Sequence, residues 1–384
     1  MPSLTGWLRR PREPDADAPG DLAHLLDRPP IKLDTPEAQR LLGGRRVLVT
    51  GAGGSIGSEL CRQIARFCPR RLVILDQSEF GLFTIRRELS ARWLGLDLRA
   101  AIADVCDERR ISDVLAQERP HVLFHAAAHK HVGLMEDNPG EAVKVNVLGT
   151  HHVAHAAARL GVGTFVFIST DKAVNPSSVM GATKRAAEQV IAGIAKDAAN
   201  TRFCCVRFGN VLGSSGSVVP IFEKQIDEGG PVTVTHPEMR RFLMTIPEAA
   251  GLVLQAGATA EGGEIFVLEM GEQVRILDLA NALIRRRGLE PGKDIAIRFT
   301  GVGAGEKLEE ELADARHPTR ATRHPKICIW LLPEPTGAAA DPVRQLRPHL
   351  DDRPADVRSA LGRVVEEYRP TGHDQPVQPL RLAA

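Results

Sequence analysis

A glycine-rich turn near the start of the chain constrains the fold more than any other feature. Gly51, Gly54 and Gly57 lie in TGAGGSIGSEL, after an apolar run at residues 46–50 and before a stretch whose apolar residues recur at helical spacing. Asp76 ends the next apolar run, about 20 residues further on. This order of strand, glycine turn, helix and acid is typical of a dinucleotide-binding unit.

The glycine turn lets the backbone approach a pyrophosphate, and the helix after it offers free N–H groups and a positive dipole end. A tight turn before a packed helix would also need glycines, so the strand, the helix and the acid carry the argument. Asp76 is placed to bind ribose hydroxyls, and no arginine follows at 77 or 78 to receive a 2′-phosphate, which favours NAD over NADP. The residues that we expect around this part of NAD are Gly51, Gly54, Ser55, Ile56, Gly57, Asp76, Gln77 and Ser78.

Short apolar runs alternate with helix-length segments as far as residue 210. Strands separated by helices predict an α/β fold with a doubly wound parallel sheet, the Rossmann arrangement. Beyond residue 210 the alternation loosens into loops rich in Gly and Pro, which favours a smaller C-terminal substrate-binding lobe. The expected strands are residues 46–50, 71–76, 98–104, 121–127, 164–170 and 203–209.

The length of 384 residues favours a large domain with a smaller companion. We expect a flexible leader over residues 1–44, with one short helix near 35–42, followed by an NAD-binding domain over 45–210. The substrate-binding lobe is expected over 211–335, with the chain crossing back to the Rossmann part. Residues 336–384 form the expected C-terminal tail, frayed from residue 369 onward.

Charge and composition exclude several classes of protein. Lys and Arg total 49 against 48 Asp and Glu, a net charge of +1 that argues against nucleic acid as the main partner. The sequence contains no apolar run of about 18 residues, so it predicts no membrane span. The charged N-terminus does not resemble a secretory signal. The six cysteines form no metal-binding or disulfide pattern, so we expect reduced thiols, no metal and a cytoplasmic protein.

Five sequence blocks resemble the extended short-chain dehydrogenase/reductase superfamily, and within it the UDP-N-acetylglucosamine 4,6-dehydratases of polysaccharide biosynthesis. They are VLVTGAGGSIGSEL, HAAAHKHVGLMEDNP, FISTDKAVNPSSVMGATKR, RFGNVLGSSGSVVPIF and GEKLEEEL. The resemblance implies a lyase that uses NAD to convert UDP-N-acetylglucosamine into UDP-2-acetamido-2,6-dideoxy-4-hexulose, for bacterial polysaccharide or amino-sugar biosynthesis. LLDRPPIKLD at residues 25–34 resembles the linker that joins a membrane region to the catalytic domain in longer members. Because this sequence lacks the membrane helices, we expect a free-standing catalytic domain. We also expect a homo-oligomer.

One position departs from the superfamily pattern. Tyr-x-x-x-Lys is usual, whereas this chain has Met180 four residues before Lys184. A thioether cannot accept a proton. The same methionine is found in one subgroup of the 4,6-dehydratases, which favours that subgroup over an inactive protein. By resemblance, Lys184 binds the ribose of the nicotinamide half.

A 4,6-dehydration removes hydride from C4, a proton from C5 and the hydroxyl from C6, and then returns the hydride to C6. By resemblance, Asp171 protonates the C6 oxygen and Lys172 takes the C5 proton, which requires a lowered lysine pKa. Ser169 and Thr170 are both candidates for orienting the C4 oxygen, and the resemblance favours Thr170. The group that takes the O4 proton stays open between Asp171, Thr170 and a water molecule. The alternative interpretation of the Asp171–Lys172 pair is a solvated turn after a strand.

Further contacts follow from the same blocks. Asp104 is expected at the adenine or as a helix N-cap, Asn146 as an active-site or packing residue, and Arg241 at the diphosphate. The remaining cofactor contacts that we expect are Asp104, Val105, Ala126, Ala127, Lys130, Asn146, Ser169 and Lys184. The expected substrate contacts are His129, Lys130, Arg207, Asn210, Arg241 and Glu306. The competing functions are a nucleotide-sugar epimerase on the same fold and a non-catalytic NAD-binding protein.

Overall fold

The computed structural model describes residues 35–314, 317–331 and 341–372. Their centre is a nine-stranded sheet with strand order β14-β15-β11-β6-β5-β4-β1-β2-β3. Neighbouring strands from β3 to β11 run parallel, and β15 and β14 are added antiparallel at one edge. The strands are β1 (Arg46–Thr50), β2 (Arg71–Asp76), β3 (Leu98–Ile102), β4 (Val122–His125), β5 (Thr164–Ile168), β6 (Arg202–Arg207), β11 (Ile265–Leu268), β14 (Thr319–Ala321) and β15 (Ile327–Trp330).

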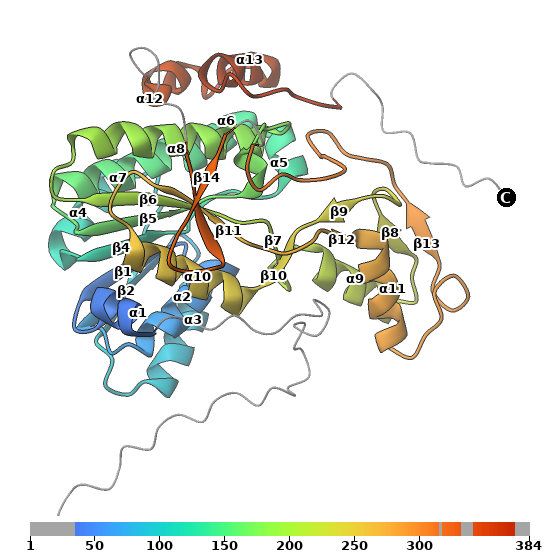
Figure 1. Ribbon diagram of the computed structural model, residues 1–384, viewed down its shortest axis with the longest axis horizontal. Helices are drawn as coiled ribbons and strands as arrows, with labels where there is room; N and C mark the ends of the chain where they lie inside the picture. The colour runs from blue at the N-terminus through green and yellow to red at the C-terminus, as the bar shows by residue number, and fades with distance from the viewer. Residues whose placement is uncertain (1–34, 315–316, 332–340, 373–384) are drawn as a thin grey trace, which may run out of the picture.

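Helices cover both faces of this sheet, as Figure 1 shows. Leu60 and Ile64 are in the core on one face, and Phe165 and Ala157 are in the core on the other. The expected doubly wound parallel sheet is therefore confirmed, and each of the six expected strands is present. The first face carries α1 (Thr35–Leu42), α2 (Ser55–Ala65), α3 (Glu79–Arg92) and α10 (Ile246–Thr259), and the second carries α4 (Glu108–Glu118), α7 (Thr150–Arg159) and α8 (Val179–Asp197).

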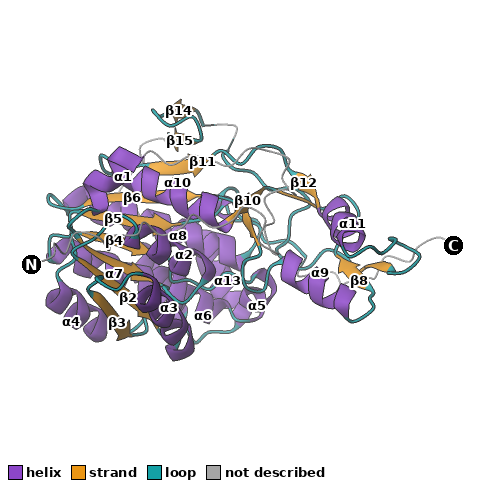
Figure 2. Ribbon diagram, turned by 90° about the horizontal axis from the view of Figure 1, so that it is seen from below, coloured by secondary structure: helices purple, strands orange, loops and turns teal. Residues whose placement is uncertain are grey.

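A smaller lobe with its own apolar core lies at one end of the sheet (Figures 1 and 2). Phe222, Leu279 and Leu283 are buried in that core. The segment 211–335 expected as the lobe also contains α10, β11, β14 and β15, which belong to the main body. The other elements are β7 (Asn210–Leu212), α9 (Val218–Asp227), β8 (Val232–Val234), β9 (Arg240–Arg241), β10 (Leu243–Thr245), β12 (Val274–Arg275), α11 (Ile276–Arg286) and β13 (Ile297–Phe299).

Both ends of the described chain pack more tightly than the sequence predicts. Helix α1 lies inside the expected leader, yet Ala38 and Leu42 are fully buried and the helix packs against α10. Residues 1–34, the rest of that leader, are outside the described ranges. In the expected tail, α12 (Pro342–Leu346) and α13 (Pro354–Val364) pack on α8, with Leu346 and Leu361 fully buried.

Residues 369–372, which we call the C-terminal strap, are the described part of the end that we expect to be frayed, and they are bonded to the body of the protein; residues 373–384 lie outside the described ranges. Arg369 N donates to Pro176 O at 2.9 Å, and Thr371 N donates to Ser177 O at 3.3 Å. Gly305 N donates to Thr371 O at 2.9 Å. The strap therefore joins two loops that are distant in sequence. In the described ranges, no helix is long and apolar enough to cross a membrane.

Candidate active site

The glycine turn has the shape that a bound pyrophosphate requires. Gly51 has a φ of 66°, and a Cβ there would lie 2.6 Å from Ala127 N. A Cβ on Gly57 would collide with the Gly51 carbonyl oxygen. Helix α2 begins at Ser55, directly after Gly54, so its N-terminal N–H groups open toward this turn. Side chains at Gly51 and Gly57 would collide with backbone atoms of the turn and of the loop after β4, so the tight turn requires glycine there.

A pocket with about 540 Å³ of empty space, part of it open to solvent, continues from the turn along the ends of β1, β2 and β4. Asp76 accepts hydrogen bonds from Gly53 N at 2.8 Å and Ser78 N at 2.9 Å. The cap of α4 is Asp107, which accepts from Arg110 N, so Asp104 is free of that alternative role and faces the pocket. The lining includes Gly51, Gly54, Asp76, Gln77, Asp104, Val105, Ala126, Ala127 and His129. His129, expected at the substrate, thus lies in the expected cofactor pocket.

Ser55 and Lys130 contact a loop that leads into the smaller lobe. Ser215 N donates to Ser55 Oγ at 3.0 Å, and Lys130 Nζ donates to Ser214 Oγ at 3.3 Å. Ile56 lies beside them at the start of α2 and packs partly against the core. These contacts tie the phosphate turn to the segment that follows β7.

Asn146 has a positioning role inside the fold. It is fully buried in a π-helical turn, Lys144–Gly149. Its Oδ1 accepts from His129 N at 2.8 Å, and its Nδ2 donates to His129 O and Thr183 Oγ1, both at 3.0 Å. Asn146 therefore holds the loop that lines the pocket, which agrees with the packing alternative.

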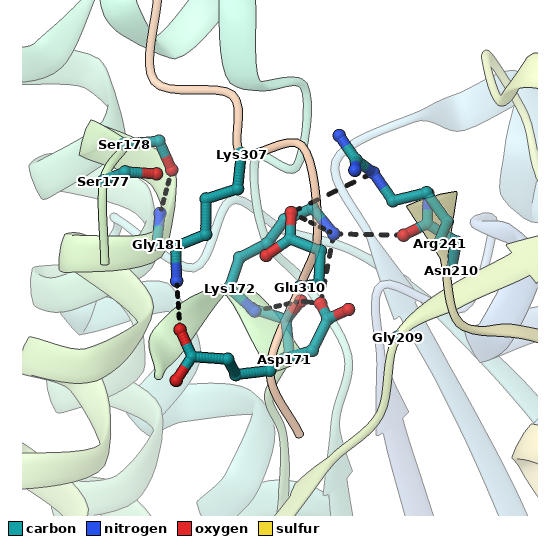
Figure 3. Close-up of polar contacts among 12 residues, drawn as sticks. Asp171, Lys172, Ser177, Ser178, Gly181, Gly209, Asn210, Arg241, Lys307 and Glu310 are labelled. Atoms are coloured by element: carbon teal, nitrogen blue, oxygen red, sulfur yellow. Dashed lines mark hydrogen bonds and ion pairs between the residues drawn. The ribbon is translucent and has the colours of Figure 1, made fainter. Parts of the chain in front are cut away.

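Polar side chains from segments that are distant in sequence converge at the end of β5, as Figure 3 shows. Thr170 caps a short turn, Asp171–Ala173, and its hydroxyl donates to Asp171 Oδ1 at 2.9 Å. Lys172 Nζ lies 3.1 Å from Asp171 Oδ1 and 3.0 Å from Asn210 Oδ1. The Asp171–Lys172 pair is thus enclosed by the fold, with Asp171 fully buried, and is not a solvated turn.

Glu310 completes this cluster, and sequence analysis missed it. Its Oε1 lies 3.5 Å from Lys172 Nζ and 4.0 Å from Arg241 Nε. The side chain is almost fully buried, and Gln273 exchanges hydrogen bonds with the Glu310 backbone at 3.2 and 3.3 Å. Oε2 of Glu310 and Oδ2 of Asp171 have no hydrogen-bond partner among the described residues.

The charge of Lys172 differs from what a resting base requires. Burial opposes its charge, but the charges of Asp171 and Glu310 outweigh burial and the repulsion from Arg241, so the pKa of Lys172 is raised. The lowered pKa that a lysine base would require is therefore absent from the substrate-free site. Lys172 is an ammonium group near neutral pH.

Met180 and Lys184 lie on the first turns of α8. Met180 is buried in an apolar cluster with Val147 and Ala182. Lys184 Nζ donates to Ile168 O at 2.5 Å and lies 3.9 Å from the centre of the Phe167 ring. Burial lowers the pKa of Lys184 to about 7, against the opposing effect of the Glu188 charge.

Two expected contacts lie in the protein interior instead of the site. Arg207 is fully buried and pairs with Glu188, with Nε to Oε1 at 2.7 Å, while its guanidinium lies 4.1 Å from the Trp330 ring centre. Ser169 Oγ also donates to Glu188 Oε1, at 2.7 Å. We therefore withdraw Arg207 as a substrate contact and Ser169 as a cofactor contact, because both side chains are buried and hydrogen-bonded to Glu188.

Arg241 and Glu306 are partly occupied by local bonds. Arg241 donates to Arg240 O at 2.7 Å and to Leu308 O at 3.2 Å while its Nε faces Glu310. Glu306 Oε2 accepts from Gly303 N at 3.0 Å and so supports its own loop. The expected diphosphate contact of Arg241 remains a prediction.

A family model described as "Polysaccharide biosynthesis protein" matches residues 47–331. The chain belongs to this family. It is 51% identical over 321 residues to the capsular polysaccharide biosynthesis protein CapD of Staphylococcus aureus, covering 83% of this chain and 53% of CapD. It is 53% identical over 306 residues to the probable polysaccharide biosynthesis protein EpsC of Bacillus subtilis, covering 79% of this chain and 51% of EpsC. The chain thus spans about half the length of these two relatives.

Relatives of this polysaccharide biosynthesis family member include enzymes with named reactions. A UDP-N-acetylglucosamine 4,6-dehydratase (inverting) of Campylobacter jejuni is 34% identical over 274 residues, 70% of this chain and 78% of the relative. A UDP-glucose 4-epimerase of Rickettsia bellii is 36% identical over 286 residues, 72% of this chain and 80% of the relative. The chain therefore groups with nucleotide-sugar dehydratases and epimerases.

Solved structures agree with the fold of this family member. Pen from Bacillus thuringiensis has a TM-score of 0.71 at 34% identity and covers 78% of this chain and 91% of Pen. DesIV from Streptomyces venezuelae, a dTDP-glucose 4,6-dehydratase solved with NAD bound, has a TM-score of 0.62 at 21% identity, covering 71% of this chain and 89% of DesIV. At that identity DesIV supports the fold alone.

Proposed function

We propose that this protein is an NAD-dependent nucleotide-sugar 4,6-dehydratase that acts on UDP-N-acetylglucosamine. The observation that carries the proposal is the buried cluster of Asp171, Lys172 and Glu310 at the end of β5. Elimination of water across C5 and C6 needs an acid and a base beside each other, and this cluster supplies two carboxylates around one ammonium. The relative named as such a dehydratase in Campylobacter jejuni supports the substrate and the reaction.

The pocket at the glycine turn fits NAD. The α2 N-terminus would bind the pyrophosphate, Asp76 the adenosine ribose and Asp104 the adenine amine. Asp76 is followed by Gln77 and Ser78, and neither carries the positive charge that would bind the 2′-phosphate of NADP. When bound, the nicotinamide supplies reversible oxidation of C4 and reduction of C6.

The chain's own residues divide the remaining tasks. Thr170, next to Asp171, would orient the C4 hydroxyl, and Lys184 would bind the nicotinamide ribose after leaving the Ile168 carbonyl. The Lys172 ammonium would stabilise negative charge that develops on O4 once C5 loses its proton. The Asp171 carboxylate would take the C4 hydroxyl proton by way of Thr170 during the oxidation, and would then give that proton to the departing C6 hydroxyl, which leaves as water.

An epimerase is the second candidate because the Rickettsia bellii relative carries that name at a similar identity. Epimerisation at C4 needs no acid for C6, and the buried Asp171–Lys172–Glu310 cluster would then have no task. Met180 also lacks the proton-accepting hydroxyl of the usual tyrosine. These residues favour dehydration.

Incubation with UDP-N-acetylglucosamine tests the proposal. A dehydratase gives a nucleotide sugar that has lost the mass of one water and absorbs in the ultraviolet after alkali, because it is a 4-keto sugar. An epimerase gives a product of unchanged mass, and a non-catalytic NAD-binding protein gives none. Either of these last results rejects the proposed reaction. Analysis of the supernatant after denaturation should show NAD, and NADP alone would contradict the cofactor assignment.

A further inference from the structure

Glu310 is the member of the buried cluster to which the family resemblance gives no role. It comes from the segment after β13, more than a hundred residues along the chain from Lys172. Gln273 exchanges two hydrogen bonds with its backbone, and its Oε1 lies 3.5 Å from Lys172 Nζ. A carboxylate this deeply buried is costly unless it is paired with positive charge. Glu310 is therefore held where it stabilises the charged form of Lys172.

Lys172 carries one proton too many for the task that the resemblance gives it. To take the C5 proton of the sugar, its Nζ must have a lone pair, and an ammonium group has none. Burial opposes the charge, but the carboxylates of Asp171 and Glu310 outweigh burial and the repulsion from Arg241, so the pKa of Lys172 is raised. One contact of the empty site must therefore be lost before Lys172 can act as a base.

The three oxygens around Lys172 Nζ differ in how readily each can be given up. An ammonium group has three N–H bonds, and Asp171, Asn210 and Glu310 offer oxygens at 3.1, 3.0 and 3.5 Å. An amine has two N–H bonds and a lone pair, so one of these oxygens has to give way. The Glu310 contact is the longest, and the same oxygen has a second cation, Arg241 Nε, at 4.0 Å. The site can therefore give up the Glu310 contact without leaving that carboxylate unpaired.

We infer that the Glu310–Lys172 ion pair is an autoinhibitory latch, which holds Lys172 in its protonated form until the sugar is bound and then opens to release a base. This inference rests on the proposed dehydration. As the sugar enters, C5 takes the place beside Nζ that Glu310 Oε1 holds in the empty site, and the surplus proton of Lys172 leaves to water. After oxidation at C4, the C5–H bond breaks, its proton goes to the Nζ lone pair and its electron pair forms an enolate on O4. Glu310 is thus a positioning residue and touches no atom of the sugar.

Opening the latch requires energy, because it separates two buried charges. The binding energy of the parts of the substrate that do not react can supply it, so the base is released only in the complex. The charged groups that face the pair are Asp171 and Arg241, together with Lys307 on the Glu310 side. Asp171 stays beside Lys172 in both states, whereas Glu310 faces it only in the empty site.

The wild type tests the latch without any substitution. With UDP-N-acetylglucosamine as substrate, the pH dependence of kcat/KM reports the free enzyme, and that of kcat reports the complex. Both should fall toward acid as Lys172 becomes protonated. Because only the free enzyme has the latch, the fall in kcat/KM should lie at higher pH than the fall in kcat, by roughly one unit or more. Falls that coincide overturn the inference, and this comparison stays decisive if a variant does not fold.

The comparison of Glu310→Gln with Glu309→Gln tests the residue itself. Glu310→Gln removes the charge and nearly keeps the size of the side chain, whereas Glu309 is an exposed neighbour paired with Arg240. In Glu310→Gln, the fall in kcat/KM should move to lower pH by roughly one unit or more, toward that of kcat, and KM at pH 7 should fall about tenfold. Glu309→Gln should match the wild type, and Glu310→Asp, which keeps the charge, should stay nearer to it. A purely structural role would lower the rates without moving the fall, and an unmoved fall overturns the inference.

Labelling of the enzyme without sugar shows which lysine titrates, since Lys184 also has a lowered pKa, of about 7. Acetic anhydride reacts with amines and not with ammonium groups, so the pH dependence of labelling, followed residue by residue by mass spectrometry, titrates Lys172 directly. Its midpoint should move to lower pH in Glu310→Gln, whereas that of the exposed Lys224 should not. A Lys172 midpoint that stays in place overturns the latch alone, whereas a wild type that makes no 4-keto product overturns the proposed function.

Discussion

Asn146 and the His129 backbone exchange two hydrogen bonds, one in each direction, at 2.8 and 3.0 Å. This pair fixes the loop between β4 and the following helix, and that loop lines the pocket that we assign to NAD. The side chain is fully buried, so water cannot replace it without rearrangement.

We therefore expect Asn146→Ala to cost about 1–3 kcal/mol of stability, since it leaves the part-buried His129 backbone groups and the buried Thr183 hydroxyl without this partner. NAD affinity should fall as well, because the loop loses its fixed position. Asn146→Asp keeps an acceptor for His129 N but loses the donor, so its effect should be intermediate. Urea unfolding and calorimetric titration with NAD measure the two effects, and wild-type NAD affinity in Asn146→Ala would contradict this role.

Replacing Arg207 with Met should destabilise the protein without changing how it recognises the substrate. Glu188 would remain buried with Arg185 as its other cation, at 3.3 Å, and breaking such a pair costs roughly 3–5 kcal/mol. The double variant Arg207→Met/Glu188→Met should be less destabilised than the single one. Thermal unfolding and KM for the UDP-sugar are the measurements. A large rise in KM with unchanged stability would return Arg207 to the substrate site.

The stability of the protein should fall between pH 6.5 and pH 5 partly because of His125. Burial, with the charge of Lys184, lowers the pKa of His125 to about 3, and its ring bonds to Thr50 at 2.7 Å and Thr150 at 3.1 Å. The unfolded chain binds a proton below its ordinary pKa near 6.5 while the folded chain does not, so stability present above that pH is lost as pH falls.

The loss from this one group should be about 2 kcal/mol at pH 5. His125→Gln removes the titrating group, so its unfolding free energy should change less between pH 7.5 and pH 5 than that of the wild type. Urea titrations at the two pH values provide the comparison. An equal pH dependence in both proteins would show that His125 is not the group responsible.

Removing the C-terminal strap should impair catalysis more than folding. A chain that ends at Tyr368 loses the strap's bonds to Pro176, Ser177 and Gly305, whereas a chain that ends at Gly372 keeps them. We expect kcat to drop roughly tenfold or more in the shorter chain, because misplacing positioned groups by a fraction of an ångström lowers rates steeply. The longer chain is the matched control, and equal kcat values in both would exclude a role for the strap.

The sheet could be predicted because its strands are apolar runs with turn residues between them. A short continuous apolar run is typical of a strand whose side chains are buried on both faces of the sheet. RLVILD, for example, is β2 over its full length. The phosphate turn could be predicted for a similar reason, since Gly51 and Gly57 are required by contacts within a few residues of each other or with the adjacent strand.

The acid–base cluster could be predicted only in part. Asp171 and Lys172 follow a strand, which is a local signal, but Glu310 lies in an acidic run, LEEEL, where nothing separates the buried glutamate from its exposed neighbours. The raised pKa of Lys172 depends on that distant residue, so no local pattern could reveal it. The assignment of Arg207 to the substrate failed for another reason. Arg207 ends the buried run RFCCVR, and that run was the available sign that its side chain lies in the interior.

The C-terminal strap makes its contacts to both loops through main-chain N–H and C=O groups. Such contacts place little demand on side-chain identity beyond excluding proline at the donor positions. Sequence comparison therefore has almost nothing to detect there, and the family match indeed stops at residue 331. Anyone who trims the protein to that boundary for expression removes the backbone bonds that hold the Pro176–Ser177 and Gly305 loops together on this side.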